Sequence, residues 1–165
     1  MIRKATEKDI PAAMELFSAA KSIMRWDGNM TQWGDCYPNE GIVRSDISKG
    51  GAHIVERYGQ PVGYFALLPS PEPTYSSIGG KWLDDTAPYF VIHRIASSPE
   101  SHGVFREIIE YALTVSGNLR IDTHRDNRIM RHVIEKAGFT YCGVIHIENG
   151  SERLAYQMPT YSPFK

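Results

Sequence analysis

The segment from Leu119 to Phe139 constrains the fold more than any other part of the sequence, because it predicts a strand, a helix and a helix stop in unbroken order. Apolar and polar side chains alternate along residues 119–124, which is the two-residue period of a strand with one buried face. Asn127 suits the cap of the following helix, in which apolar residues recur on one side: Ile129, Met130, Val133, Ile134 and Ala137. Gly138 readily adopts the left-handed conformation at which helices end.

Length and charge favour a single domain covering residues 1–165 that acts on a small partner. The chain has 18 basic and 19 acidic side chains and a formal net charge of −1. This balance gives neither the basic surface typical of nucleic-acid binding nor a basic belt for a membrane, so we expect a small-molecule or peptide partner. We find no apolar run near the roughly 20 residues that span a bilayer and no apolar signal core. Cys36 and Cys142 form neither a disulfide framework nor a metal-type cluster, so we expect a cytoplasmic protein without a metal.

The remaining elements follow from hydrophobic periodicity and from helix and turn signals. We expect a strand over residues 1–5, a helix from Asp9 to about Arg25, and a second helix from Asn39 to about Lys49. Strands are expected over 52–57, 61–68 and 89–97, a helix from 104 to Gly117, and a closing hairpin over 139–158 with its turn at Asn149-Gly150. Two long irregular connections, 26–38 and 69–88, separate these elements.

The element order and the Asn127 helix resemble the Gcn5-related N-acetyltransferases. In that family an Asn at the head of a helix, followed eleven and twelve residues later by Gly-Phe and then a strand, forms the last conserved block, and Gly138-Phe139 match it here. The resemblance covers nearly the whole chain. It implies an α/β fold with a mixed, mostly antiparallel sheet of about seven strands and about four helices, splayed at the cleft that holds acetyl-CoA. It also implies N-acetyltransferase activity with acetyl-CoA as co-substrate.

The resemblance also implies where the cofactor binds. In the family a glycine-rich turn after the central strand offers backbone N–H groups at a helix N-terminus to the pyrophosphate, a position that favours anions. The matching segment here runs from Glu100 to Phe105, keeps one glycine, places Glu100 where a cation is usual and is about two residues shorter. A plain strand-to-helix turn without ligand is the alternative. On the cofactor reading, the binding residues are Ile95, Ala96, Ser97, Ser101, His102, Gly103, Val104 and Asn127.

His93 is the favoured general base. It lies two residues before Ile95, where many related enzymes carry a Glu, and the ordinary histidine pKa of about 6.5 suits a base. A packed sheet residue is the alternative reading of His93, and Arg94 is expected on the opposite face in a structural role. The family's usual acid, a Tyr seven residues after the Asn, is Ile134 here. The acid is therefore expected among Tyr141, Tyr156, His124 and water, which makes His93, His124 and Tyr141 the catalytic candidates.

Aromatic residues in the irregular connections favour an enclosed, partly apolar acceptor site, although each one could also be packing. Asp122 shares the polar face of its strand with His124, and a solvated strand end is the alternative reading. The substrate-binding candidates are Trp26, Trp33, Tyr37, Tyr75, Trp82 and Asp122.

The main hypothesis is direct acetyl transfer from acetyl-CoA to an amine of a small molecule or peptide. Direct transfer is favoured because neither Cys36 nor Cys142 lies in a motif that marks a nucleophile. The first alternative is a non-catalytic acyl-CoA-binding or ligand-sensing module on the same fold, which the missing Tyr and the altered phosphate loop favour. The second is an interaction domain without a nucleotide. An exposed edge in the closing hairpin would allow a homodimer.

Overall fold

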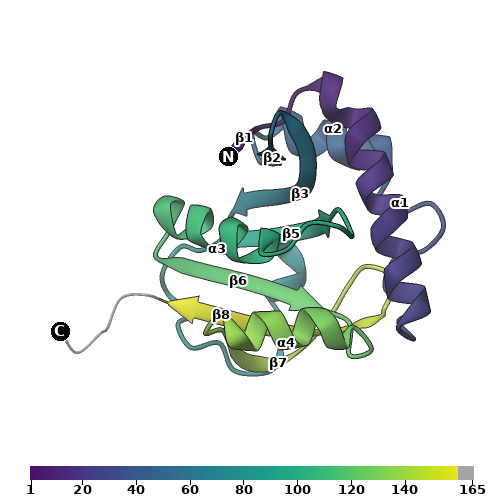
Figure 1. The fold of residues 1–165 in the computed structure, drawn as a ribbon. Helices are drawn as coiled ribbons and strands as arrows, with labels where there is room; N and C mark the ends of the chain where they lie inside the picture. Colours follow the sequence, from purple (N-terminus) through teal and green to yellow (C-terminus); the bar gives the residue numbers. More distant parts are fainter. Residues whose placement is uncertain (160–165) are drawn as a thin grey trace.

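The computed structural model describes residues 1–159, and the expected domain end at Lys165 lies outside them. The strands are β1 (Ile2–Lys4), β2 (Ala52–Arg57), β3 (Gln60–Pro69), β4 (Gly79–Gly80), β5 (Phe90–Ser97), β6 (Asn118–Thr123), β7 (Thr140–His146) and β8 (Glu152–Pro159). The α-helices are α1 (Ile10–Trp26), α2 (Glu40–Ser48), α3 (Val104–Val115) and α4 (Arg128–Lys136), and two short 3-10 helices cover Glu7–Asp9 and Pro73–Tyr75. Apart from β4 and the two 3-10 helices, the order of elements is the expected one (Figure 1).

All strands join one mixed sheet with the order β1-β2-β3-β5-β6-β8-β7-β4. Among the described residues, β5 and β6 pair in parallel and every other neighbouring pair is antiparallel, which confirms the expected sheet type. The short strand β4 raises the strand number from about seven to eight. Its two glycines pair with Val144 and Gly143, and a Cβ at Gly143 would collide with the carbonyl oxygen of Gly79. A strand made only of glycine has no side-chain period, so the sequence could not reveal it.

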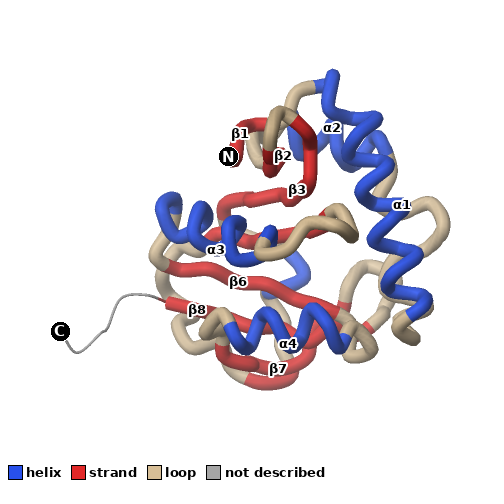
Figure 2. The backbone as a smooth tube through the Cα atoms, in the orientation of Figure 1, coloured by secondary structure: helices blue, strands red, loops and turns tan. Residues whose placement is uncertain are grey.

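Two helices cover each face of the sheet (Figures 1 and 2). On one face, α1 and α2 pack against Tyr64 and Ile54 through Phe17 and Val43. On the other face, α3 and α4 pack against a larger cluster that includes the neighbouring residue Phe65. Adjacent residues of β3 thus bury opposite faces, as the two-residue period of a strand requires. The fold is a three-layer arrangement in which the sheet is buried on both sides.

Three predicted helix ends, at Asn39, Asn127 and Gly138, are confirmed by their hydrogen bonds. The side chain of Asn39 accepts a hydrogen bond from the Ile42 N–H, and that of Asn127 accepts one from the Met130 N–H. Gly138 has φ +105°, and the N–H groups of Gly138 and of the next residue donate to carbonyl oxygens of the last helical turn. This pattern is the Schellman motif, and it ends α4 where the glycine predicts.

The sheet opens between its two parallel strands. The pairing of β5 with β6 covers three residue pairs and stops at Ile92 and Ile121, although β5 continues to Ser97 and β6 to Thr123. On its other side β5 carries an extra residue relative to β3, and Arg94 within this bulge has φ +55°. A bulge redirects side chains and increases twist. His93 and Arg94 both line the cavity that opens here. Arg94 also forms an ion pair with Asp46 of α2, which suits the structural role expected for it.

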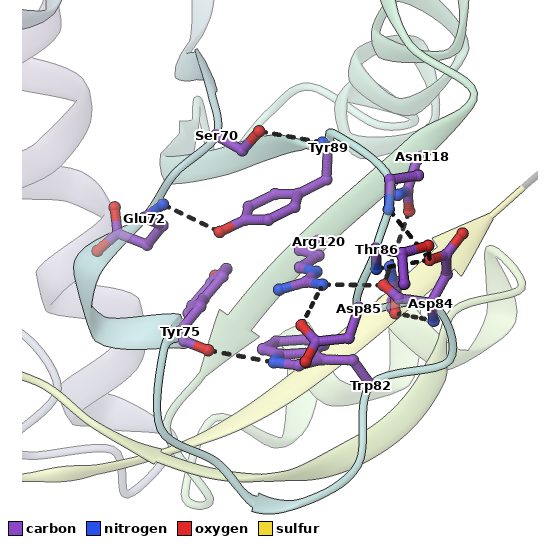
Figure 3. A network of polar contacts seen from close by, with 12 residues as sticks. Ser70, Glu72, Tyr75, Trp82, Asp84, Asp85, Thr86, Tyr89, Asn118 and Arg120 are labelled. Carbon is purple, nitrogen blue, oxygen red and sulfur yellow. Dashed lines mark hydrogen bonds and ion pairs between the residues drawn. The ribbon is translucent and has the colours of Figure 1, made fainter.

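The long connection from residue 70 to 89 forms a compact cluster around the buried side chain of Arg120 (Figure 3). The guanidinium carbon of Arg120 lies 3.9 Å from the ring centroids of both Trp82 and Tyr89, so the cation is held between two aromatic faces. Its Nη2 also donates to the Asp84 carbonyl oxygen at 3.0 Å. Tyr75 completes the cluster, because its carbonyl oxygen accepts a hydrogen bond from the Trp82 indole at 3.2 Å.

We expect Arg120→Lys to lower the free energy of unfolding by about 1–2 kcal/mol, because an ammonium keeps the charge but cannot stack as a plane between two rings. Chemical denaturation measures the change. The control is Arg128→Lys, since the side chain of Arg128 is 73% exposed and its change should stay below about 0.5 kcal/mol. Equal stabilities for the Arg120 variant and the unmodified protein would show that the stacked geometry contributes nothing.

Candidate active site

A cavity of about 850 Å³ lies where β5 and β6 separate. Its walls come from the α1–α2 connection, the second half of α2, the 3-10 helix at Pro73–Tyr75, the bulged part of β5, the end of β6 and the β7–β8 turn. The sequence-predicted residues that line it are Trp33, Tyr37, His93, Ile95, Asp122 and Asn127. The splay of the sheet thus creates a site that collects residues from distant parts of the chain.

His93 forms the centre of the polar wall together with Glu72. The Nε2 atom of His93 lies 3.3 Å from Glu72 Oε2, and both side chains are largely buried. The Thr74 hydroxyl and N–H hold the other carboxylate oxygen of Glu72, at 2.8 and 3.4 Å. Burial raises the pKa of Glu72, but the hydrogen bond and charge of His93 and the hydrogen bonds from Thr74 outweigh it and lower the pKa to about 2. Glu72 is therefore a fixed carboxylate that orients the His93 ring.

A buried ion pair stabilises the bulge beside His93. Arg94 binds Asp46 with two hydrogen bonds, from Nη2 to Oδ1 at 2.5 Å and from Nε to Oδ2 at 2.9 Å. The Tyr64 hydroxyl donates to the same Asp46 Oδ2 at 2.7 Å, and Arg94 Nη1 donates to the Tyr37 hydroxyl at 3.2 Å. Burial lowers the pKa of Arg94, but the hydrogen bond to Asp46 and the neighbouring charges outweigh burial. The pKa of Arg94 therefore lies above its ordinary value. The pair ties α2 to β5.

Asp122 and Arg153 bring opposite charges to the end of the cavity formed by β6 and β8. Asp122 Oδ2 accepts a hydrogen bond from the Tyr75 hydroxyl at 2.6 Å. Burial, and then the charge of Asp122, raise the pKa of Tyr75 well above its ordinary value, so this hydroxyl keeps its proton and remains a donor. Arg153 is 5% exposed, lines the cavity, and donates to the carbonyl oxygens of Glu152 and Gln32 at 2.8 and 2.9 Å.

Asn127 ties the α1–α2 connection to the start of α4. Its Nδ2 donates to Gln32 Oε1 at 3.0 Å, while its Oδ1 caps α4. The same Gln32 oxygen accepts a second hydrogen bond, from Asn29, at 2.8 Å. Close by, the buried hydroxyl of Thr123 lines the cavity and has no hydrogen-bond partner among the described residues. A ligand in the cleft thus meets a fixed amide and an available hydroxyl.

The strand-to-helix turn lies outside the cavity and begins α3. Ser97, Ser101, His102 and Val104 are not among the residues that line the cavity, and neither is Gly103, which caps α3 with φ +76°. The first N–H groups of a helix have no partner within it. Arg57, from the end of β2, forms an ion pair with Glu107, and its Nη2 would lie 3.9 Å from a Cβ placed on Gly103. A cation from another strand therefore lies beside the turn that lacks one of its own.

Several sequence-predicted residues lie away from the cavity. Trp26 is 94% exposed at the end of α1, and Ala96 is buried under α1 and α2. Tyr75 and Trp82 belong to the aromatic cluster around Arg120, where both are buried. Tyr75 reaches the site only through its hydroxyl, which contacts Asp122.

The three acid candidates are also absent from the residues that line the cavity. Tyr141 is 51% exposed on β7, and Tyr156 is buried in the core below α4. His124 accepts a hydrogen bond from the Asp126 N–H at Nδ1, and its Nε2 lies 3.4 Å from the Thr31 hydroxyl. Burial, and then the charge of Arg153, lower the pKa of His124 and favour its neutral form. Ile134 is fully buried in the core, so the family's Tyr position faces the sheet here.

Sequence reasoning missed Glu72 and Asp46. Glu72 lies in a proline-rich irregular segment and Asp46 inside a helix, so neither belongs to a recognisable local pattern. Arg153 was visible only as a charge on the last strand. Each becomes part of the site through long-range packing that no local pattern reports.

Residues 1–159 contain no group of three or more His, Cys, Asp or Glu side chains placed to hold a metal ion. None of their helices is both long enough and apolar enough to cross a membrane.

Comparison with solved structures identifies the class of protein. An acetyltransferase of the GNAT family from Streptococcus agalactiae superposes with a TM-score of 0.86 and 32% sequence identity, over 98% of this chain and 96% of that one. A GNAT-family acetyltransferase from Listeria monocytogenes gives a TM-score of 0.70 at 20% identity, over 95% and 92% of the two chains. A ribosomal-protein-alanine N-acetyltransferase from Brucella melitensis gives 0.61 at 20% identity, over 96% and 99%. No protein-family model and no curated protein sequence matches this chain.

The identity and coverage of the streptococcal structure show the family, and the two more distant structures show the same fold. The chain belongs to the GNAT family of acetyltransferases.

Proposed function

We propose that the protein is an N-acetyltransferase that uses acetyl-CoA to acetylate an amine of a small molecule or peptide by direct transfer. The observation that carries this proposal is the His93–Glu72 pair, which lies inside the cavity at the point where β5 and β6 part. The ribosomal-protein-alanine N-acetyltransferases among the similar structures act, by their names, on an amine. An amine acceptor beside His93 agrees with that chemistry.

The residues of the cavity suit the proton transfers of this reaction. An alkylammonium with a pKa near 10 must lose a proton before its nitrogen attacks, and His93 accepts that proton. The carboxylate of Glu72 stabilises the imidazolium that results. Backbone N–H groups of β5 near Ile95 polarise the thioester carbonyl, the C–N bond forms as the C–S bond breaks, and the thiolate takes a proton from water.

Features of the cleft fit acetyl-CoA, which supplies the acetyl group as an activated thioester. The edge of β5 beyond Ile92 has no strand partner on the β6 side within residues 1–159, so its backbone groups suit the amides of the pantetheine arm. The unpartnered hydroxyl of Thr123 and the amide of Asn127 lie on the opposite side of the cleft. The start of α3, with Arg57 beside it, suits the pyrophosphate because helix N-termini and guanidinium groups both bind phosphate oxygens.

A non-catalytic acyl-CoA-binding or ligand-sensing module is the second candidate. It is favoured by the positions of Tyr141, Tyr156 and His124, none of which lines the cavity. A sensor needs the cofactor cleft and the acceptor pocket but no acid for the leaving thiolate. The two candidates therefore share the binding prediction and differ only in turnover.

Calorimetric titration with acetyl-CoA, followed by measurement of free thiol released across an amine panel, tests the proposal. We expect saturable binding with micromolar Kd, thiol release that depends on an acceptor, and an N-acetylated product in mass spectrometry. Cys36→Ser should keep full activity, because this cavity residue has no role in direct transfer. Binding without thiol release over a diverse panel would support the sensor, and no binding at millimolar acetyl-CoA would reject both candidates.

A further inference from the structure

Arg153 is a buried guanidinium that forms no direct ion pair with a carboxylate within residues 1–159. It is 5% exposed, and its two hydrogen bonds within residues 1–159 go to the carbonyl oxygens of Glu152 and Gln32. Described ion pairs join other arginines to carboxylates, but Arg153 belongs to none of them. A buried cation without an anion is costly, because desolvation is not repaid by Coulomb attraction. Arginines almost never remain fully buried unless they are paired.

The charge of Arg153 lies at the wall of the cavity. The residue lines the cavity, as does Asp122. Burial lowers the pKa of Arg153 below its ordinary value, although the nearby charge of Asp122 acts in the opposite direction. Arg94, the other arginine in the wall, already binds Asp46 with two hydrogen bonds. Lys49 also lines the cavity but is exposed. Arg153 is thus the buried cation of the wall that is available to an anionic ligand.

Two negative groups also line the cavity. Glu72 is held as a carboxylate beside His93, and Asp122 accepts a hydrogen bond from the Tyr75 hydroxyl. A cavity that presents a free guanidinium together with fixed carboxylates is complementary to a ligand that carries both an anionic and a cationic group. An ammonium is attracted to Glu72 and Asp122, and a carboxylate fits the planar donors of Arg153.

We infer that the acceptor is an amino acid, a molecule that carries a carboxylate in addition to the reacting amine, and that Arg153 binds this carboxylate. The inference rests on the proposed function and deepens it, because it names the acceptor class of the same cavity. The carboxylate of a free amino acid and that of a peptide C-terminus share this chemistry, and the test below separates them.

The test compares acceptors in matched pairs. Each amino acid, from glycine to 6-aminohexanoate and including the common L-amino acids, is assayed beside its carboxamide, and short peptides are assayed beside their C-terminal amides. We expect at least one pair in which kcat/KM for the carboxylate exceeds that for the amide by about 10- to 100-fold, the range of hydrogen bonds to charged groups. Calorimetric binding of the preferred acid supplies a readout that does not depend on turnover.

Variants then assign the preference to Arg153. Arg153→Gln can still donate to a backbone carbonyl but has no charge, so we expect the carboxylate-to-amide ratio to fall to about 1 while kcat/KM for the amide changes less than about threefold. Arg153→Lys should keep part of the preference, because an ammonium binds a carboxylate without the bidentate geometry. Arg125→Gln is the matched control, since Arg125 is 63% exposed and pairs with Glu152 next to Arg153.

The outcomes separate this inference from the proposed function. If thiol release occurs but acid and amide are used equally, or if Arg153→Gln folds and keeps the preference, Arg153 does not bind a carboxylate. If no amine supports thiol release, the proposed function fails. Binding of an amino acid that is weakened at least tenfold in Arg153→Lys and Arg153→Gln would still support Arg153 as the carboxylate ligand, and no amino-acid binding at millimolar concentration would overturn it.

Discussion

Replacing His93 with alanine is expected to lower kcat/KM for the acceptor amine by about 10²- to 10⁴-fold at neutral pH, the usual contribution of a positioned general base. The loss should shrink as the pH rises toward 10, because an amine that is already deprotonated no longer needs a base. Initial rates of thiol release between pH 6 and pH 10 measure both effects. The Kd for acetyl-CoA should change less than about twofold, since the proposed mechanism assigns His93 to the acceptor amine and not to the cofactor.

His132→Ala is the matched control for this variant, because His132 is exposed on α4. A His93 variant that kept its full rate at every pH would show that His93 is a packed sheet residue, which was the alternative reading of the sequence. A uniform loss at all pH values, with weaker acceptor binding, would assign His93 to acceptor binding rather than to proton transfer. The pH dependence therefore decides between the roles.

Glu72→Gln tests whether the Glu72 carboxylate contributes to catalysis through its contact with His93. The carboxyl pKa of about 2 means that Glu72 stays ionised over the whole assay range, so it does not itself produce a limb of the pH–rate profile. Glu72→Gln removes the carboxylate that contacts His93 Nε2, so the ring loses its fixed orientation and kcat should fall about tenfold. Because the folded-state pKa lies below the ordinary value of 4.5, the stability that Glu72 contributes is complete above about pH 4.5 and is lost as the pH falls toward 2.

The fold could be predicted from the sequence wherever local chemistry determines the element. Asn39 and Asn127 cap their helices, and Gly138 ends α4, because these residues satisfy backbone groups within a few positions of themselves. Strand β4 and the bulge of β5 could not be predicted. Both depend on the register of a neighbouring strand that is distant in sequence, and a bulge leaves the hydrophobic pattern of its own strand nearly unchanged.

The site, like the fold, could be predicted only where local sequence signals determine the position of a residue. Some site residues were predicted from their place in a regular element. His93 and Asp122 were predicted from their strands and Asn127 from the helix that it caps, and all three line the cavity. Aromatic character alone was a poorer guide, since Trp82 and Tyr89 enclose a buried guanidinium and Trp26 faces solvent. An aromatic ring in a loop indicates burial or contact but does not say with what.

The largest loss of stability is expected from Asp46→Ala, at about 3–5 kcal/mol. Asp46 is 1% exposed and accepts three hydrogen bonds, two from Arg94 and one from the Tyr64 hydroxyl. Burial, and then the charge of Asp46, raise the pKa of Tyr64 far above its ordinary value, so its hydroxyl keeps its proton and needs an acceptor. Removal of the carboxylate leaves a buried cation and a buried hydroxyl without their partner. Chemical denaturation followed by circular dichroism measures the loss.

A second variant separates two quantities: the stability lost when one partner of the Asp46–Arg94 ion pair is removed, and the net contribution of the intact ion pair to stability. Replacing Asp46, Arg94 and Tyr64 together with Leu, Met and Phe removes the buried cation and the buried hydroxyl that Asp46→Ala leaves unsatisfied, and we expect most of the lost stability to return. Activity should not return with it, because Arg94 has φ +55° in the bulge beside His93, and the ion pair with α2 holds that backbone in place. A triple variant that regained both stability and activity would show that the bulge forms without the ion pair. Stability without activity would instead assign the pair to positioning His93 within the cavity.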